Sequence, residues 1–171
     1  MEMDDVDRFR QSWARELPDV DTRGMAILGR ALRIVGRARP EILSIMEKHG
    51  LDGGTFDVLA TLRRAGPPYT MRPTEMYRSL MVTSGGLTAR LNRLEAVGLI
   101  ERPPAPDDGR SLLVQLTPRG RDLVETVFGQ DMEIEARMLA GLSEDEQEAL
   151  AALLRKLGAT MFETIPAAPS R

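Results

Sequence analysis

The sequence predicts a mainly α-helical protein with one small β element. Apolar residues recur at helical spacing over most of the 171 residues, whereas two short apolar segments flank a stretch rich in proline, aspartate and glycine. The chain has no cysteine and a single histidine, His49, so disulfides and thiolate metal sites are excluded. We therefore predict neither a metal site nor a cofactor.

Four helices are predicted in the first half of the chain. Pro18 ends the first, and Pro40 is expected to kink or break the second. Asp52 is the candidate N-cap of the third, and Pro73 occupies the first position of the fourth. The first lies around residues 6–13, and the others cover residues 21–48, 52–65 and 73–80.

A fifth helix is predicted from Thr83, its N-cap, to about Val97, where Gly98 ends it. One of its faces is apolar, whereas the opposite face carries small and polar residues. A helix that enters the major groove of DNA needs such a face, since bulky side chains would block the approach. An ordinary surface helix is the alternative. The residues predicted to contact DNA here are Ser84, Gly85, Gly86, Thr88, Ala89, Asn92 and Arg93.

Two short strands are predicted after this helix, at residues 99–102 and 111–116, with a hairpin loop at residues 103–110. Another helix opens at Thr117-Pro118. Helices followed by such a hairpin form a winged helix-turn-helix. We therefore predict this unit, with N- and C-terminal dimerisation helices on either side of it.

The last helix is predicted from a capping box formed by Ser143 and Glu146. A stripe follows that is too apolar to face water on a small domain. We therefore expect a two-fold homodimer built from the first and last long helices. The stripe comprises Leu150, Leu153, Leu154, Leu157 and Met161.

Charge is distributed unevenly along the chain. The net charge is −3, yet residues 61–121 carry ten Lys or Arg against five Asp or Glu. A basic segment between acidic ends indicates contact with phosphate, although such charge blocks also arise by chance on solvated faces. The sequence contains no signal-peptide pattern and no apolar run long enough to span a membrane. We therefore expect a cytoplasmic protein without a membrane partner.

The segment from Leu87 to Val124 resembles the MarR family of dimeric, ligand-responsive repressors. It carries a recognition helix, Gly-Leu-Ile, Glu-Arg, an Asp-x-Arg wing and Leu-Thr-x-x-Gly, and the wider resemblance covers about residues 21–163. The resemblance implies binding to pseudo-palindromic operators in double-stranded DNA. It also implies that Arg110 of the wing enters the minor groove while Asp108 holds it in place.

The N-terminal extension and the segment around the recognition helix resemble the PecS-like, urate-responsive subgroup of that family. This resemblance implies an effector site for urate or a similar small anion, whose binding releases the DNA. A carboxylate among apolar neighbours, as at Asp57, requires a cation. A structural ion pair of Asp57 with Arg90 is the alternative. The implied effector site consists of Trp13, Asp57, Arg90 and Arg102.

Two other functions stay open. The first is a MarR-type regulator that senses another aromatic acid or a lipophilic drug, and the second is a winged helix used only for protein contacts. An enzyme is not expected, because the sequence contains no catalytic constellation. The predicted domains are an N-terminal extension helix at 1–18, a helical dimerisation region at 19–50 and 119–165, the winged helix-turn-helix at 51–118 and a frayed tail at 166–171.

Overall fold

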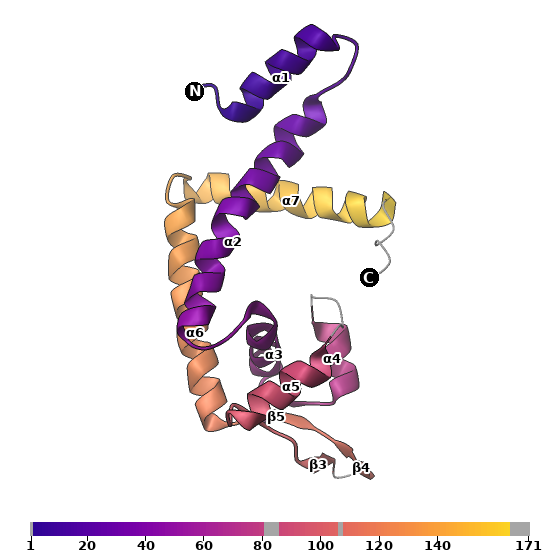
Figure 1. Cartoon of the computed structure of the whole chain (residues 1–171), viewed down its shortest axis with the longest axis vertical. Coiled ribbons are helices and arrows are strands. Elements are labelled where there is room, and N and C mark those ends of the chain that lie inside the picture. The colour runs from indigo at the N-terminus through magenta and orange to yellow at the C-terminus, as the bar shows by residue number, and fades with distance from the viewer. Residues whose placement is uncertain (1, 81–85, 106–107, 165–171) are drawn as a thin grey trace. The chain divides into compact units, whose positions relative to one another are not determined.

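The computed structural model describes residues 2–80, 86–105 and 108–164, and only the backbone of residues 108–111, 162 and 164 (Figure 1). The described residues are mainly helical and carry a small antiparallel sheet, as predicted. The chain forms two compact units, Met1–Ser44 and Ile45–Arg171. No helix among the described residues is long and apolar enough to cross a membrane. The predicted tail at 166–171 lies outside the described residues.

The N-terminal unit is a helical hairpin. Helix α1 (Asp5–Glu16) folds back beside η1 (Met25–Gly29), a π-helical turn that continues into α2 (Arg30–Lys48) (Figure 1). Arg30 fastens the hairpin, because its Nε lies 2.8 Å from Asp4 Oδ2 and its Nη2 lies 2.8 Å from Asp7 Oδ1.

Pro40 lies inside a continuous α2, so of the two expected outcomes, a kink or a break, the break is wrong. A proline in a helix frees the carbonyl group four residues earlier, here that of Gly36. Gly36 is exposed, so water can satisfy this carbonyl, and the absence of a side chain at Gly36 leaves room near the ring.

Helix α3 (Gly53–Arg64) is the centre of the second unit. Its predicted N-cap is confirmed: Asp52 Oδ1 accepts a hydrogen bond from the Thr55 amide at 2.7 Å, and Thr55 Oγ1 accepts one from the Asp52 amide at 2.9 Å. Helix α3 packs against α4, α5, α6 and β5. Its side chains Val58, Leu59 and Leu62 are completely buried.

Two further helices complete the helix-turn-helix. Helix α4 (Pro73–Ser79) begins with proline as predicted, and α5 (Leu87–Ala96) follows it. The N-cap of α5 lies three residues later than the sequence predicted. Its N-cap, Gly86, has a φ of +92°, a left-handed conformation that cannot belong to a right-handed helix. The predicted cap Thr83 lies outside the described residues.

A three-stranded antiparallel sheet of order β1-β5-β2 closes this unit. The predicted pairing of the segments after α5 is confirmed, with Ile100 opposite Leu116. No strand was predicted at the position of β1. The strands are β1 (Thr70–Met71), β2 (Ile100–Glu101) and β5 (Val114–Leu116).

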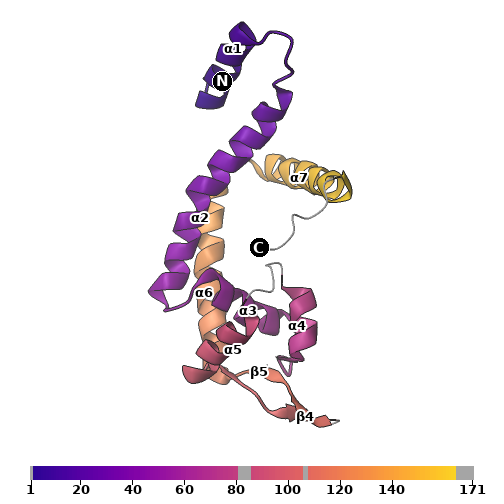
Figure 2. The same cartoon turned by 45° about the vertical axis from the view of Figure 1, so that its right-hand side comes forward.

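The wing is more extended than predicted. Part of the expected loop at residues 103–110 forms strand β3 (Pro104–Ala105), which pairs with β4 (Asp108–Leu112) as a second sheet. Figure 2 shows β4 reaching away from the helices. Proline suggested a loop because it cannot donate a ladder hydrogen bond, but an edge strand tolerates that loss.

The remaining helices begin where their caps predicted. Helix α6 (Pro118–Leu139) is capped by Thr117, whose Oγ1 accepts from the Gly120 amide at 3.0 Å. Helix α7 (Glu144–Thr164) begins at the predicted capping box. The Ser143 hydroxyl accepts from the Glu146 amide at 3.2 Å, and the Glu146 carboxylate accepts from the Ser143 amide at 2.8 Å.

Candidate nucleic-acid interface and effector site

Helix α5 has one buried and one exposed face. Its leucines at positions 87, 91 and 94 are at most 4% exposed and pack inward. The opposite face is free of large apolar side chains, as a reading helix requires. Four predicted contact residues lie exposed on it: Thr88, Ala89, Asn92 and Arg93.

Gly86 directly precedes this helix. No atom of the described residues lies within 4 Å of the position that a Cβ would occupy, whereas its φ is positive, so the backbone conformation accounts for this glycine. Ser84 and Gly85, also predicted to contact DNA, lie outside the described residues.

Arg93 is anchored to the start of α3. Its Nη1 lies 3.1 Å from Asp52 Oδ2, and both side chains are more than half exposed. Burial alone would raise the pKa of Asp52, but hydrogen bonds from Thr55 and the field of Arg93 lower it overall. An exposed ion pair contributes only about 0–1 kcal/mol. The pair therefore orients Arg93 and leaves its guanidinium accessible to a phosphate.

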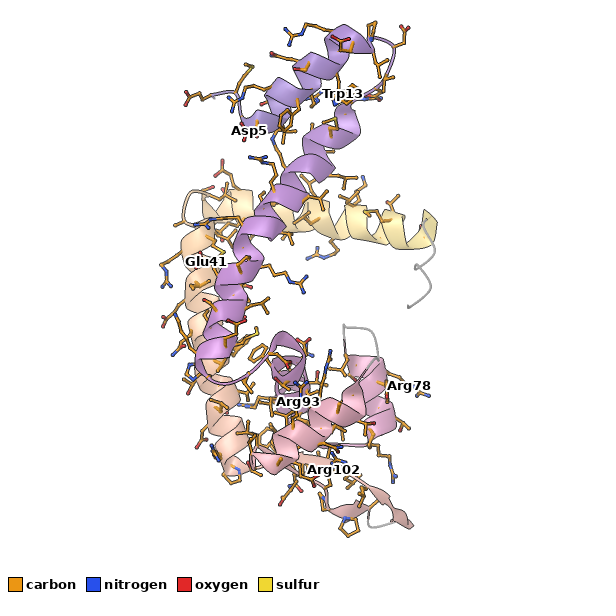
Figure 3. All side chains as sticks on the ribbon, viewed as in Figure 1. Asp5, Trp13, Glu41, Arg78, Arg93 and Arg102 are labelled. Atoms are coloured by element: carbon orange, nitrogen blue, oxygen red, sulfur yellow. The ribbon has the colours of Figure 1, made fainter. Side chains whose placement is uncertain are left out.

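Arg102 is held by α5. Its Nη2 donates to Asn92 Oδ1 at 2.5 Å, and its Nε lies 3.3 Å from Glu95 Oε2. The Arg102 side chain is only 19% exposed. Figure 3 shows Arg93 and Arg102 in this region of the second unit. The residue predicted as an effector ligand therefore connects the end of β2 to the reading helix.

The wing places two further predicted residues on a strand. The backbone of Asp108 and Arg110 belongs to β4, and Asp108 is paired with Ala105 of β3. Their side chains lie outside the described part of the chain. Insertion of Arg110 into a minor groove therefore stays a prediction.

The side chain of Arg90 lies against α3 at Gly54, where it occupies space that any side chain at position 54 would need. An added Cβ at Gly54 would lie 2.3 Å from Arg90 Cζ. Asp57 is one helical turn after Gly54 and therefore on the same face of α3. Burial raises the pKa of Asp57, and the positive charge of Arg90 offsets part of this effect.

The alternative interpretation, a structural ion pair of Asp57 with Arg90, is not observed among the described residues. The charge of Arg90 acts on the Asp57 carboxylate without a direct contact. Arg90 is half-buried against α3, so the fold brings the two residues into one neighbourhood without direct contact.

Asp57 also lines an apolar pocket of about 400 Å³ between α3 and α6. A second carboxylate there, Asp131, is only 7% exposed, and its Oδ1 has no hydrogen-bond partner among the described residues. Burial and the neighbouring Glu135 raise the pKa of Asp131. Asp131 could not be singled out from the sequence, because its neighbours on α6 follow an ordinary helical pattern. The pocket is also lined by Phe56, Ala60, Thr61, Arg63, Arg64, Val124, Glu125 and Phe128.

Trp13, the fourth predicted effector residue, belongs to α1 of the N-terminal unit (Figure 3). It is 48% exposed and borders a shallow hollow together with Leu17 and Met25. An indole exposed at this level is free to stack on a flat ligand. Its role stays a prediction.

The helix-turn-helix carries an exposed cation, Arg78, that was not predicted to contact DNA. Arg78 projects from α4 into solvent (Figure 3). The basic balance of residues 61–121 was the signal that could have identified it.

The second unit has the elements of a winged helix-turn-helix protein. A short helix, a helix with an exposed polar face and a β wing pack on one core. Residues 49–111 match the model of the MarR family. The chain is 37% identical over 156 residues to the HTH-type transcriptional regulator PecS of Dickeya dadantii, covering 90% of this chain and 92% of PecS. The chain belongs to the MarR family of winged-helix transcriptional regulators, and the predicted likeness to PecS is confirmed.

Solved structures agree with this assignment. A MarR variant from E. coli in complex with operator DNA has 29% sequence identity and a TM-score of 0.63, covering 81% of this chain and 99% of that chain. Bordetella bronchiseptica BpsR, whose DNA binding is regulated by 6-hydroxynicotinic acid, has 27% identity and a TM-score of 0.63, covering 81% and 98%.

Proposed function

We propose that this protein is a homodimeric repressor that binds a pseudo-palindromic operator and leaves it when urate or a similar small anion binds. The observation that carries the DNA-binding part is the exposed, small-residue face of α5 beside the accessible Arg93. The likeness to a MarR protein in complex with operator DNA supports this role. We propose no catalytic activity.

The dimer is supported by apolar faces that one chain leaves uncovered. On α2, Leu32 is 75% exposed, and Ile34 and Val35 are also exposed. On α7, Leu153 and Leu154 are exposed in the same way. Apolar surface on this scale indicates a protein partner. A two-fold dimer would present two α5 helices to half-sites about one turn, roughly 10 bp, apart.

The effector is proposed to act at Asp57 and Arg90. An anion that enters there is attracted by Arg90 and repels the Asp57 carboxylate, whose pKa burial already raises. Because Arg90 belongs to α5, its movement would shift the reading helix. A ligand changes DNA affinity only if it binds the DNA-incompetent conformation better.

Two sources support a small aromatic anion. The relative BpsR responds to 6-hydroxynicotinic acid. Trp13, the single tryptophan of the chain, offers an exposed ring for stacking. A regulator that senses a carboxylic acid of this type is the second candidate.

Binding of operator-length duplexes, measured with and without urate, tests the proposal. We expect specific DNA binding that urate weakens, together with quenching of Trp13 fluorescence. Arg90→Ala should reduce the response to urate more than it reduces DNA binding. If urate changes neither the fluorescence nor the DNA affinity while 6-hydroxynicotinate changes both, the second candidate is correct. Absence of any DNA binding would instead favour a winged helix used for protein contacts.

A further inference from the structure

The side-chain amide of Asn92 is held in one orientation. Arg102 Nη2 donates to Asn92 Oδ1 at 2.5 Å. A guanidinium has only donors, so the atom that faces it must be the amide oxygen and not the amide nitrogen. The Asn92 NH₂ group is therefore directed away from Arg102, on the exposed face of α5.

Arg102 is itself fixed at a second point. Its buried Nε lies 3.3 Å from Glu95 Oε2, one helical turn beyond Asn92, as an ion pair without a hydrogen bond among the described residues. The hydrogen bond to Asn92 and the ion pair with Glu95 together keep the guanidinium beside α5, where it faces the amide oxygen of Asn92. Glu95 also neutralises Arg102, so Arg102 adds little attraction for phosphate.

The orientation of this amide determines what it can read. Adenine presents an acceptor and a donor in the major groove, so its bidentate recognition by asparagine requires the amide oxygen as well as the NH₂. Guanine presents two acceptors, N7 and O6. The hydrogen bond from Arg102 turns the Asn92 oxygen toward the guanidinium, so the amide presents its NH₂ donors outward, and these match guanine and not adenine.

We propose that Arg102 is a positioning residue that makes Asn92 a donor-only reader, selecting guanine over adenine at one base pair of each half-site. This inference rests on the proposed function, in which α5 enters the major groove. It assigns Arg102 to operator specificity, a role separate from the effector site in which sequence resemblance placed it.

The test measures dissociation constants for a selected operator and for all single base-pair changes in one half-site. For the wild-type protein we expect one position at which G·C to A·T weakens binding about tenfold. Asn92→Ala and Arg102→Met should each reduce that ratio to about twofold or less, and the double variant should reduce it no further. The salt dependence should stay unchanged in Arg102→Met, because no phosphate contact is lost.

Two further variants separate positioning from folding. Asn92→Asp keeps a partner for Arg102 but has no donor, so it should lose the preference for guanine and retain the wild-type melting temperature. Arg119→Met is the matched control, because the Nη1 of Arg119 donates to the Val97 carbonyl just beyond α5 at 3.0 Å. It removes an arginine near the same helix and should leave the preference for guanine intact.

Two outcomes overturn the inference and differ in what else they overturn. Specific binding whose base preferences are the same in wild type and Arg102→Met overturns the inference alone, as does a preference for adenine that depends on Asn92. Failure of the wild-type protein to prefer any duplex sequence overturns the proposed function and the inference with it.

Discussion

The N-terminal unit and the winged-helix region differ in how many of their apolar side chains are buried within one chain. In the winged-helix region, α3 is enclosed by other elements, and Val58, Leu59 and Leu62 are completely buried. In the N-terminal unit, Val6 is the buried apolar residue among those described, whereas Leu32 and Ile34 are exposed. The winged-helix region thus has a core of its own, and the N-terminal unit is held together largely by surface ion pairs.

The N-terminal unit is therefore the part that we expect to depend on another subunit for its stability. Burial of a leucine contributes about 1.5–3 kcal/mol, whereas an exposed ion pair contributes about 0–1 kcal/mol. A helical hairpin fastened by Arg30 and two aspartates therefore needs further burial to be stable. The proposed dimer supplies that burial, and five substitutions test the comparison.

Leu32→Glu has the largest expected effect. If the face of α2 that carries Leu32 is buried in a dimer, the change removes two apolar contacts and inserts two charges. We expect the dimer to lose about 3–6 kcal/mol, from about 1.5–3 kcal/mol for each copy. Sedimentation velocity should then show monomers at micromolar concentration. Arg37→Glu, also exposed on α2, is the control and should remain dimeric. A dimeric Leu32→Glu protein would show that this face has no partner.

Gly120→Ala should damage the winged-helix core instead. An added Cβ would lie 2.0 Å from the Leu99 carbonyl oxygen, a backbone atom that cannot move without displacing β2. We expect a loss of about 3 kcal/mol in the free energy of unfolding. Gly129→Ala on the same helix meets nothing within 4 Å and should gain about 0.5–1 kcal/mol. Equal denaturation midpoints for the two variants would contradict the packing at Gly120.

Arg110→Ala tests whether the wing contributes to DNA affinity. We expect operator binding to weaken by about 1–3 kcal/mol and to depend less on salt. The reason is that the variant loses one cation that lies near the phosphates of the minor groove. Electrophoretic mobility or fluorescence anisotropy at several salt concentrations measures both. Binding equal to that of wild type at moderate salt would remove Arg110 from the interface.

Asp131→Asn tests the buried carboxylate of the second unit. Because burial raises the pKa of Asp131 above its usual value, the folded protein binds this proton more tightly than the unfolded chain does. The destabilising effect of the charge is therefore complete at neutral pH and disappears as pH falls through the folded pKa. Asp131→Asn should stabilise the protein by about 1 kcal/mol at pH 7.5 and by nothing near pH 3.5. A destabilised variant at pH 7.5 would indicate that the partner subunit supplies a cation.

Gly54→Ala has the smallest expected effect on stability. The new Cβ displaces the flexible end of Arg90 and not the backbone, so we expect less than about 1 kcal/mol of change in unfolding free energy. If Arg90 transmits the effector signal, the variant should bind operator normally and respond to urate less than wild type does. A normal urate response would show that the contact between Arg90 and α3 is not part of the switch.

The sequence alone determined the features that depend on neighbouring residues. The N-caps at Asp52, Thr117 and Ser143 were predicted because a cap bonds an amide three residues away. The buried face of α5 was predicted because its leucines recur with the period of the helix. These interactions involve residues within about one turn of each other, so the sequence contains all the information needed to find them.

Tertiary structure alone decided the contacts between residues far apart in the chain. The pairing of β1 with β5 joins Thr70 to Gln115, and no local pattern marks so short a strand. The close approach of Arg90 to Gly54 and the hydrogen bond of Arg102 to Asn92 also depend on how the elements pack. A side chain of this length can reach several neighbours. Which of them it meets depends on how the helices and the wing pack, because that packing fixes the distances.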